Sequence, residues 1–394
     1  MSIILDKHTE FSQRAARIQS RMKKEGLDAM VVTSPTNVWY VTGFWEFIAI
    51  RMEFVLIPAE GELCFMVSKN EHEYAEKTSW IDDVRYYTEF PEEGRHQNPY
   101  DLLKEVIIEK GLSRATIGIE EASLALSDFR IFQQLAPDAQ FKDSSVVLRE
   151  LRTIKSAYEV DLLKKSGRVA VAAWNASLQV AKPGLREYEV AQAARHAATE
   201  MSMSQFGPED INHSPLTDGV QLIQSGQRSS ISHGRGGPNR LRRGDMVAMC
   251  FCMTNQFKGY RVGFSRNFAL GQATDEMYKV YDIIYRAQRK ALDEVKPGAK
   301  ASDLDRMVRE MIYDAGYGEH IEHRLGRGVG LDIAEAPDLK EGDDTLLQPG
   351  MTLAVEPAIY ITNTWGIQLE DSICVTEDGF EYLTVAPEPE LPII

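Results

Sequence analysis

The segment SGQRSSISHGRGG (225–237) leads into two apolar runs, GDMVAMCFCM (244–253) and GYRVGFSRNF (259–268). Apolar runs beside a glycine-rich loop predict two neighbouring strands, with His233 at the point where the strands open. The glycines beside His233 let the backbone approach a ligand closely, and histidine exchanges protons near neutral pH. His233 is therefore a candidate catalytic residue. The alternative is a loop residue that only makes hydrogen bonds.

The pattern around this segment occurs twice in the second half of the chain. Lys-Pro-Gly follows a long helical pattern at 182–184 and again at 296–298, and a glycine-led apolar run comes later at 244–247 and at 350–353. Proline stops a helix because it lacks the backbone N–H and fixes φ. Two copies of helix–helix–strand, roughly 110 residues apart, predict a duplicated, two-lobed domain with its site between the lobes. The helical patterns cover 156–181, 187–201, 274–294 and 302–315.

Residues 1–150 alternate between helical and strand patterns, which predicts a separate α/β domain. The charged stretch LRELRTIKSAYE (148–159) marks the joint, so the predicted domains are 1–153 and 154–394 of a chain of the α/β (α+β) class. A loop in the first domain contains Trp39, Trp45, Phe47 and Arg51, and such a loop either packs locally or covers a ligand. Helices are expected at 10–27, 70–78 and 99–111, and strands or extended runs at 28–34, 37–44, 53–68, 83–88 and 115–123.

Composition excludes several classes of function. The chain has 394 residues, 44 of them Lys or Arg and 59 Asp or Glu, and a formal net charge of −15. A surface this acidic repels nucleic acid and anionic membranes. Neither is therefore an expected partner. Four cysteines in so long a chain do not make a disulfide framework. Because no signal peptide and no membrane-length apolar run is visible, we expect a soluble, cytoplasmic protein.

Two glutamates and one arginine are the charged candidates for a site. Glu356 in LAVEPAIY and Glu370 in IQLEDSI lie inside apolar, strand-like runs. Burying a carboxylate there is costly unless it is paired, so the two glutamates predict a receptor for a cation or metal, or else a structural salt bridge. Arg327 in LGRGVGLDIAEAP lies among glycines, where a guanidinium can grip a carboxylate. The alternative for Arg327 is an ordinary salt bridge to Asp332 or Glu335.

Two cysteines alternate on one strand. Cys250 and Cys252 are two residues apart and therefore point to the same face. Free cysteine is among the most buried residue types, which favours two small buried apolar residues. The alternative is that Cys250 is a nucleophile toward an amidine carbon, which requires a lowered thiol pKa.

Residues 152–384 resemble the pita-bread fold of methionine aminopeptidase, prolidase and creatinase. The motifs that carry the resemblance are LRTIKSAYEVDLLKKS, GDMVAMCFCM, GVGLDIAEAP, GMTLAVEPAIY and GIQLEDSICVTEDGFEYLT. The resemblance implies a C-terminal pseudo-symmetric pita-bread domain and a smaller N-terminal creatinase-like α/β domain. It also implies a homodimer.

The resemblance also shows where this chain departs from the family. The metallopeptidases of the family bind two metals through two aspartates, a histidine and two glutamates. The glutamates fall on Glu356 and Glu370, whereas the aspartates fall on Cys250 and Gly263 and the histidine falls on Arg327. Glycine has no side chain to donate, and arginine repels a divalent ion. We therefore expect no metal and no other cofactor, since metal-dependent peptide cleavage needs an activated bridging water.

Creatinase and ectoine hydrolase are similar to one another in fold and in lacking this metal centre. The resemblance to creatinase places a catalytic histidine on His233 and brings Arg51 near an arginine that reaches the substrate carboxylate from the partner subunit. Ser265 stands where creatinase has a further glutamate, which disfavours creatine. A site with two glutamates and one or two arginines also matches the opposite charges of a small zwitterion.

The sequence therefore predicts a homodimeric, metal-independent hydrolase of a C–N bond in a small amidinium or guanidinium carboxylate. The first choice of reaction is ectoine ring opening to N-acetyl-diaminobutyrate. The alternatives are a creatinase, an Xaa-Pro peptidase-like protein and a catalytically dead binding protein. The predicted catalytic residues are His233, Glu356 and Glu370, and the predicted substrate-binding residues are Arg327, Arg51, Cys250, Phe47 and Tyr260.

Overall fold

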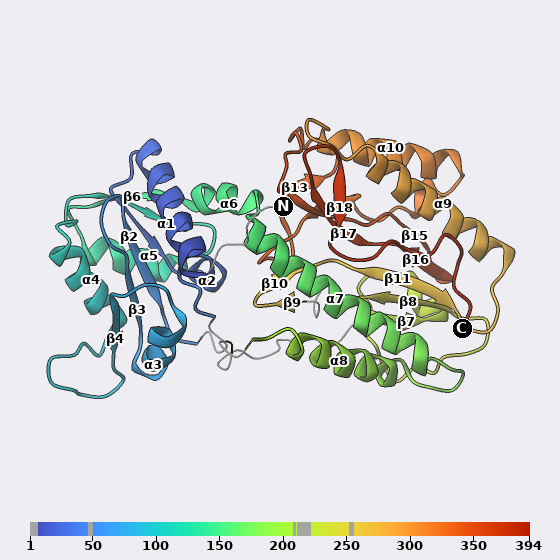
Figure 1. Ribbon diagram of the computed structural model, residues 1–394, viewed down its shortest axis with the longest axis horizontal. Coiled ribbons are helices and arrows are strands. Elements are labelled where there is room, and N and C mark those ends of the chain that lie inside the picture. Colours follow the sequence, from blue (N-terminus) through green and yellow to red (C-terminus); the bar gives the residue numbers. More distant parts are fainter. Residues whose placement is uncertain (1–6, 46–49, 208–209, 211–221, 252–255) are drawn as a thin grey trace. The chain divides into compact units, whose positions relative to one another are not determined.

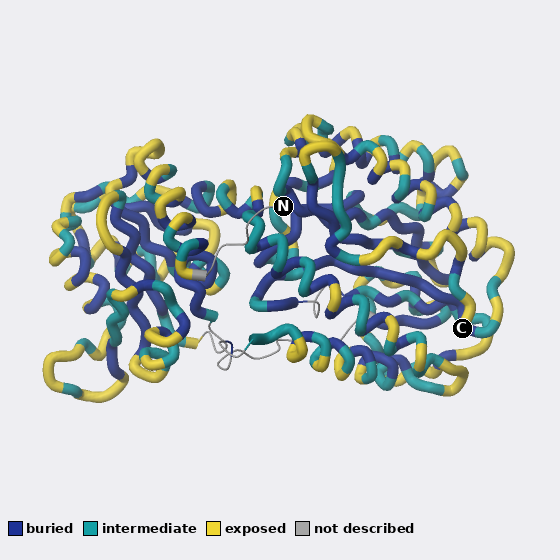
Figure 2. Tube along the Cα trace, in the orientation of Figure 1, coloured by how far each residue is buried: buried dark blue, intermediate teal, exposed yellow. Residues whose placement is uncertain are grey.

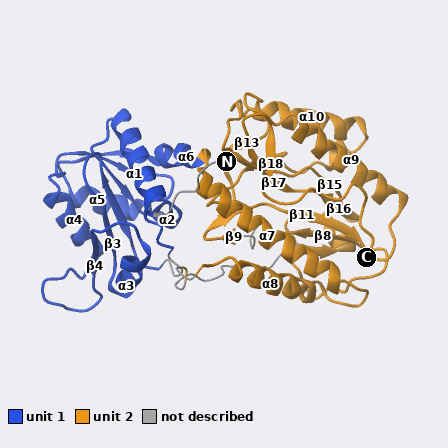
Figure 3. Cartoon of the chain, viewed as in Figure 1, with its two compact units in different colours: residues 1–152 blue, residues 153–394 orange. Residues whose placement is uncertain are grey.

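The chain divides into two compact units, Met1–Arg152 and Thr153–Ile394, in the computed structural model (Figure 3). The structure describes all residues except 1–6, 46–49, 208–209, 211–221 and 252–255. The division falls one residue before the one expected from the sequence, at the end of a helix. Both units combine helices with β-sheet (Figure 1), which confirms the predicted α/β class.

The first unit is built on a mixed sheet covered by helices (Figure 1). Its strands are β1 (Ala29–Val32), β2 (Phe54–Pro58), β3 (Cys64–Ser68), β4 (Val84–Tyr87), β5 (Thr116–Ile119) and β6 (Gln140–Asp143). They run in the order β4–β3–β2–β1–β5–β6, with β1 antiparallel to β2 and parallel to β5. Every residue of β1, β2 and β3 is buried, so these strands form the centre of the unit's core. Its helices are α1 (Lys7–Lys24), α2 (Pro35–Thr42), α3 (Lys69–Thr78), α4 (Pro99–Glu109), α5 (Leu126–Leu135) and α6 (Ser145–Thr153).

The run at 37–44 was expected to be extended, but it lies in helix α2. Ser34 caps the helix by accepting a hydrogen bond from the Asn37 N–H at 3.4 Å, and Pro35 occupies the first turn. Gly43 ends the helix in the left-handed region, at φ 73°. This capping and the fixed φ of proline outweigh the strand preference of valine, tryptophan and tyrosine in the run.

The second unit contains two larger sheets and two pairs of long helices (Figure 1). Its helices are α7 (Ala157–Val180), α8 (Glu187–Met203), α9 (Asp275–Asp293) and α10 (Ala301–Asp314), with short 3₁₀ turns η2 (Gly226–Ser230) and η3 (Gly318–His320). Its strands are β7 (Leu222–Ser225), β8 (Met246–Cys250), β9 (Gln256–Phe257), β10 (Tyr260–Arg261), β11 (Ser265–Ala269), β12 (Gly326–Gly328), β13 (Glu335–Leu339), β14 (Thr352–Val355), β15 (Ala358–Ile361), β16 (Trp365–Gln368), β17 (Asp371–Val375) and β18 (Phe380–Tyr382).

One sheet has the order β11–β8–β7 and the other has the order β13–β12–β14–β17–β18. The two sheets meet where the backbones of Ser265 and Glu370 exchange hydrogen bonds, both of 3.1 Å. Figure 2 shows that the strands on both sides of this junction are buried. Glu370 therefore enters the interior of the unit at the place where the two sheets join.

The two halves of the second unit repeat one another in detail. Gly184 and Gly298, the glycines of the two Lys-Pro-Gly motifs, both have positive φ and both donate their N–H to a leucine carbonyl, of Leu241 and Leu347 respectively, at 2.8 Å. Three residues after each leucine comes a second positive-φ glycine, which precedes β8 in one half and β14 in the other. The repeat expected from the sequence is therefore also present in the hydrogen bonds of the turns.

Candidate active site

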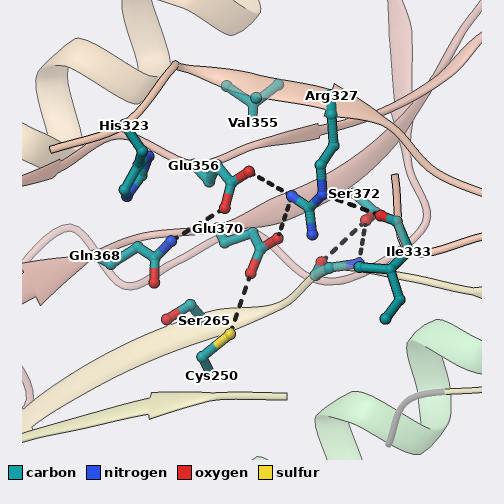
Figure 4. A network of polar contacts seen from close by, with 12 residues as sticks. Cys250, Ser265, His323, Arg327, Ile333, Val355, Glu356, Gln368, Glu370 and Ser372 are labelled. Atoms are coloured by element: carbon teal, nitrogen blue, oxygen red, sulfur yellow. Dashed lines mark hydrogen bonds and ion pairs between the residues drawn. The ribbon is translucent and has the colours of Figure 1, made fainter. Parts of the chain in front are cut away.

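An ion-paired cluster lies at the junction of the two sheets and consists of Arg327, Glu356, Glu370 and Cys250 (Figure 4). The Nη1 of Arg327 donates to Oε1 of Glu356 and, at 3.1 Å, to Oε1 of Glu370. The Nε of Arg327 donates to the carbonyl oxygen of Ile333 at 3.0 Å. The Cys250 thiol donates to the other oxygen of Glu370 at 3.7 Å. One guanidinium thus holds both glutamates, and the thiol contacts the second of them.

Strand pairing explains why these side chains meet. Val355, the last residue of β14, is paired with Asp371, the first residue of β17. Their neighbours Glu356 and Glu370 therefore stand opposite one another. Arg327 comes from the adjacent strand β12, between Gly326 and Gly328. A Cβ at Gly326 would lie 2.0 Å from the Ala354 carbonyl oxygen, so glycine is needed for β12 to approach β14.

Burial sets the electrostatics of the cluster. Glu370 is fully buried, and burial, reinforced by the charge of Glu356, raises its pKa to about 7, with Arg327 opposing the rise. Burial also raises the pKa of Glu356, again against the charge of Arg327. A carboxyl group whose pKa lies near 7 can take up or release a proton at neutral pH. The cluster therefore has the protonation chemistry of a candidate active site.

Glu370 should make the protein less stable as the pH rises from about 4.5 to about 7. Its pKa in the folded state is about 7, above the unfolded value of 4.5, so the folded state binds the proton more tightly. The resulting stability is present below the unfolded pKa and is lost as the pH rises through the folded pKa. Glu370→Gln cannot titrate. The free energy of unfolding of wild type relative to this variant, measured in urea across this range, should fall with pH, and a constant difference would contradict the assignment.

Three residues contribute to the site without having been predicted. Gln368 donates its Nε2 to Oε2 of Glu356 at 3.1 Å. The ring of His323 lies beside the glutamates (Figure 4), with Nδ1 2.8 Å from the Arg324 carbonyl oxygen and Nε2 3.3 Å from the Tyr360 hydroxyl. Burial lowers the pKa of His323 and raises that of Tyr360. Gln368 stands two residues before Glu370, which was an available signal, whereas His323 has no spacing signature.

The other predicted substrate-binding residues are Tyr260, Arg51 and Phe47. Tyr260 is fully buried, and its hydroxyl donates to Oε1 of Glu159 at 2.7 Å, which supports the first turn of α7. Arg51 lies in the first unit, where its guanidinium pairs with Glu89 at 3.0 Å. Phe47 is outside the described residues. The roles of these three residues in substrate binding remain predictions.

His233 is exposed, and among the described residues it has no hydrogen bond to the ion-paired cluster. It lies in the loop 225–239, which Glu187 of α8 organises. The fully buried Glu187 carboxylate accepts hydrogen bonds from Ser225 N–H at 2.9 Å and Gly237 N–H at 3.0 Å, and from the Arg228 guanidinium at 3.2 Å. One glutamate thus fixes both ends of the loop that contains His233.

The chain belongs to metallopeptidase family M24, whose model matches residues 161–377, and carries a creatinase/prolidase N-terminal domain at residues 14–154. It is 30% identical over 372 residues to an Xaa-Pro dipeptidase of Pyrococcus furiosus, covering 94% of this chain and 97% of that protein. It is 29% identical over 375 residues to the putative dipeptidase YkvY of Bacillus subtilis, covering 95% of this chain and 98% of that one.

Solved structures give the same picture. The Xaa-Pro dipeptidase from Bacillus anthracis superposes with a TM-score of 0.83 at 28% identity, over 98% of this chain and all of that one. The prolidase from Pyrococcus horikoshii superposes with a TM-score of 0.80 at 29% identity, over 95% of this chain and 99% of that one. The predicted arrangement of a creatinase-like N-terminal domain and a pita-bread domain is therefore confirmed.

These matches correct the predicted reaction. Ectoine ring opening, amidine or guanidine hydrolysis and the label of a metal-independent enzyme are wrong, because the matching family is one of metallopeptidases and the full-length relatives are named as dipeptidases. The broader prediction of a hydrolase family acting on C–N bonds is confirmed, but that family is one of peptidases. As for membranes, no described helix is both long and apolar enough to cross a bilayer.

The side chains at this site do not fit the pair of divalent ions that the family implies. The Arg327 guanidinium lies against both glutamates, so its positive charge is where a metal would need to be. At Gly263, a Cβ would fall 2.0 Å from Oε1 of Glu370, which leaves no room for an aspartate. Within the ranges that the structure describes, no three His, Cys, Asp or Glu side chains are grouped as metal ligands.

Proposed function

We propose that the protein recognises Xaa-Pro dipeptides, or similarly short peptides, at the ion-paired cluster and hydrolyses their peptide C–N bond. The observation that carries this proposal is similarity over nearly the whole chain to proteins named as Xaa-Pro dipeptidases. Retention of Glu356 and Glu370 at the sheet junction supports it further. A short peptide is a zwitterion, so a cluster that combines carboxylates with a guanidinium can attract both of its ends.

In this proposal the cluster residues divide the work. Glu370, with its pKa near 7, holds or accepts a proton beside the scissile bond. Arg327 orients a carbonyl or carboxylate oxygen of the peptide, and Glu356 attracts its amino group. His233 serves as a catalytic residue from the loop 225–239, which Glu187 holds in place. A homodimer, in which Arg51 of one subunit serves the other, belongs to the same proposal.

A second candidate function is peptide binding without cleavage. The specific observation in its favour is that Arg327 already pairs with both glutamates. A carboxylate engaged by a guanidinium is a weaker base than a free one, because the positive charge stabilises the ionised form. Such a site binds a peptide more readily than it activates water.

Proline release from a panel of Xaa-Pro dipeptides should decide between the two functions. We expect proline release measurable by liquid chromatography with mass spectrometry in assays that contain Mn²⁺. Glu370→Gln should lower kcat by ~10²-fold or more, because it removes the proton-transfer group. The matched control is Glu381→Gln, a half-exposed glutamate that pairs with Lys164 outside the cluster.

Two other outcomes have clear meanings. Peptides that raise the melting temperature but release no proline would favour the binding function. Peptides that neither raise the melting temperature nor release proline would overturn both functions. Unchanged kcat in Glu370→Gln would remove Glu370 from the reaction while leaving the substrate assignment intact.

A further inference from the structure

We infer that Arg327, Gly263 and Cys250 replace the family's metal ligands as one coupled set. The Arg327 guanidinium is the resident cation of Glu356 and Glu370, and Gly263 provides the space that Glu370 occupies. This make-up of the site does not depend on whether the protein cleaves peptides. Changing any one of the three residues alone to the family's metal ligand should lower the stability of the fold.

The charge of Arg327 balances the two glutamates. Glu370 is fully buried and Glu356 beside it is 13% exposed, and two carboxylates so placed repel one another strongly unless a cation lies between them. Arg327 supplies that cation from β12, with Nη1 reaching both carboxylates. Its own orientation is fixed by the bond from Nε to the Ile333 carbonyl oxygen at 3.0 Å. The guanidinium is therefore held in place and is part of the folded site.

The space that Glu370 occupies requires a glycine at position 263. A Cβ at Gly263 would stand 2.0 Å from Oε1 and 2.7 Å from Cδ of Glu370, and 3.1 Å from the Cβ of Ala354. Glu370 cannot swing aside, because Arg327 holds one of its oxygens and the Cys250 thiol contacts the other. The Gly263 N–H and carbonyl are also fixed, both bonded to the Ser372 hydroxyl at 2.9 Å. Only glycine fits at position 263 while Arg327 pins Glu370.

The Cys250 thiol also matches the cluster in charge. Cys250 donates its S–H toward Oε2 of Glu370, which a carboxylate at the same position could not do. Aspartates at both 250 and 263 would place four carboxylates around a single guanidinium. A neutral thiol and an absent side chain instead leave two carboxylates for one cation. The three residues therefore match each other in charge and in volume.

A double-mutant cycle on the full chain tests the coupling. Gly263→Ala should raise the equilibrium constant for unfolding at least tenfold, about 1.4 kcal/mol, as measured in urea, because its Cβ meets Oε1 of Glu370. In an Arg327→His background the guanidinium no longer holds Glu370. There the same change should raise the unfolding constant by a factor at least five times smaller. The control is Gly379→Ala, because a Cβ at Gly379 meets nothing within 4 Å and its φ is not positive. This control should change the unfolding constant by less than a factor of about two to three.

Metal titration provides the second readout. Mn²⁺ binding by calorimetry, after dialysis against a chelator, should be at least tenfold tighter in the triple variant Cys250→Asp/Gly263→Asp/Arg327→His than in wild type. If the triple variant does not fold, the Gly263→Ala cycle decides the inference, since its readout is the unfolding constant and not metal binding. Strictly additive effects, or wild-type Mn²⁺ binding as tight as that of the triple variant, would overturn the inference.

Discussion

Arg327→Met is expected to lower the free energy of unfolding by about 3–5 kcal/mol at a pH above 7, which is the usual cost of removing one partner from a buried ion pair. Methionine keeps much of the side-chain bulk but removes the charge. Glu356 and Glu370 then face each other without a cation, and the Ile333 carbonyl oxygen loses its donor. Urea unfolding at equilibrium gives the value directly.

The matched control is Arg324→Met, three residues away. Arg324 is about one-third exposed and pairs with Asp338 at 3.2 Å, so its loss should cost less than about 1 kcal/mol. Adding Glu356→Gln and Glu370→Gln to Arg327→Met should restore much of the stability, since a neutral buried cluster no longer needs the cation. A loss in Arg327→Met as small as that in Arg324→Met would show that solvent, and not the guanidinium, balances the glutamates.

Glu187→Ala should produce the second large effect, a loss of about 3 kcal/mol in the free energy of unfolding. The change leaves the N–H groups of Ser225 and Gly237 without their acceptor, and each buried unsatisfied group costs about 1–3 kcal/mol. The Arg228 guanidinium loses its carboxylate as well, but Arg228 is partly exposed and adds little. Hydrogen exchange should also become faster across the loop 225–239.

Glu200→Ala on the same helix is the control for this prediction. Glu200 is exposed, so its replacement should change the free energy of unfolding by no more than about 0.5 kcal/mol. Glu187→Gln should fall between the two, because an amide still accepts hydrogen bonds but does not balance the charge of Arg228. If exchange in the loop is unchanged in Glu187→Ala, the loop is held by other contacts.

Much of the fold could be predicted from local pattern. Helical periodicity and the two Lys-Pro-Gly stops gave the four long helices of the second unit to within two residues at either end. The opposed positions of Glu356 and Glu370 were also foreseeable, because buried carboxylates in neighbouring apolar strands need a common partner. The sequence left two partners open for Arg327, a ligand carboxylate and an ordinary salt bridge. In the structure Arg327 forms ion pairs with the two glutamates.

Other features depend on tertiary contacts that no local pattern contains. Tyr260 is aromatic and follows a turn, which suits a ligand contact, but its hydroxyl is engaged by Glu159 more than 100 residues earlier. His323 reaches the site only because the turn before β12 folds it back toward Tyr360. The reaction could not be predicted from the metal ligands. Their loss favours a different substrate, whereas the full-length similarity is to proteins named as dipeptidases.

The repeat within the second unit has a consequence for how the site is shared. Arg327, Glu356 and Glu370 all belong to the later copy of the helix–helix–strand motif, whereas the earlier copy contributes Cys250 and Gly263, a thiol and a missing side chain. Every formal charge of the ion-paired cluster therefore comes from one half of a duplicated structure. The earlier half contributes a neutral wall, so the electrostatic balance set by the later half holds only while positions 250 and 263 carry no charge.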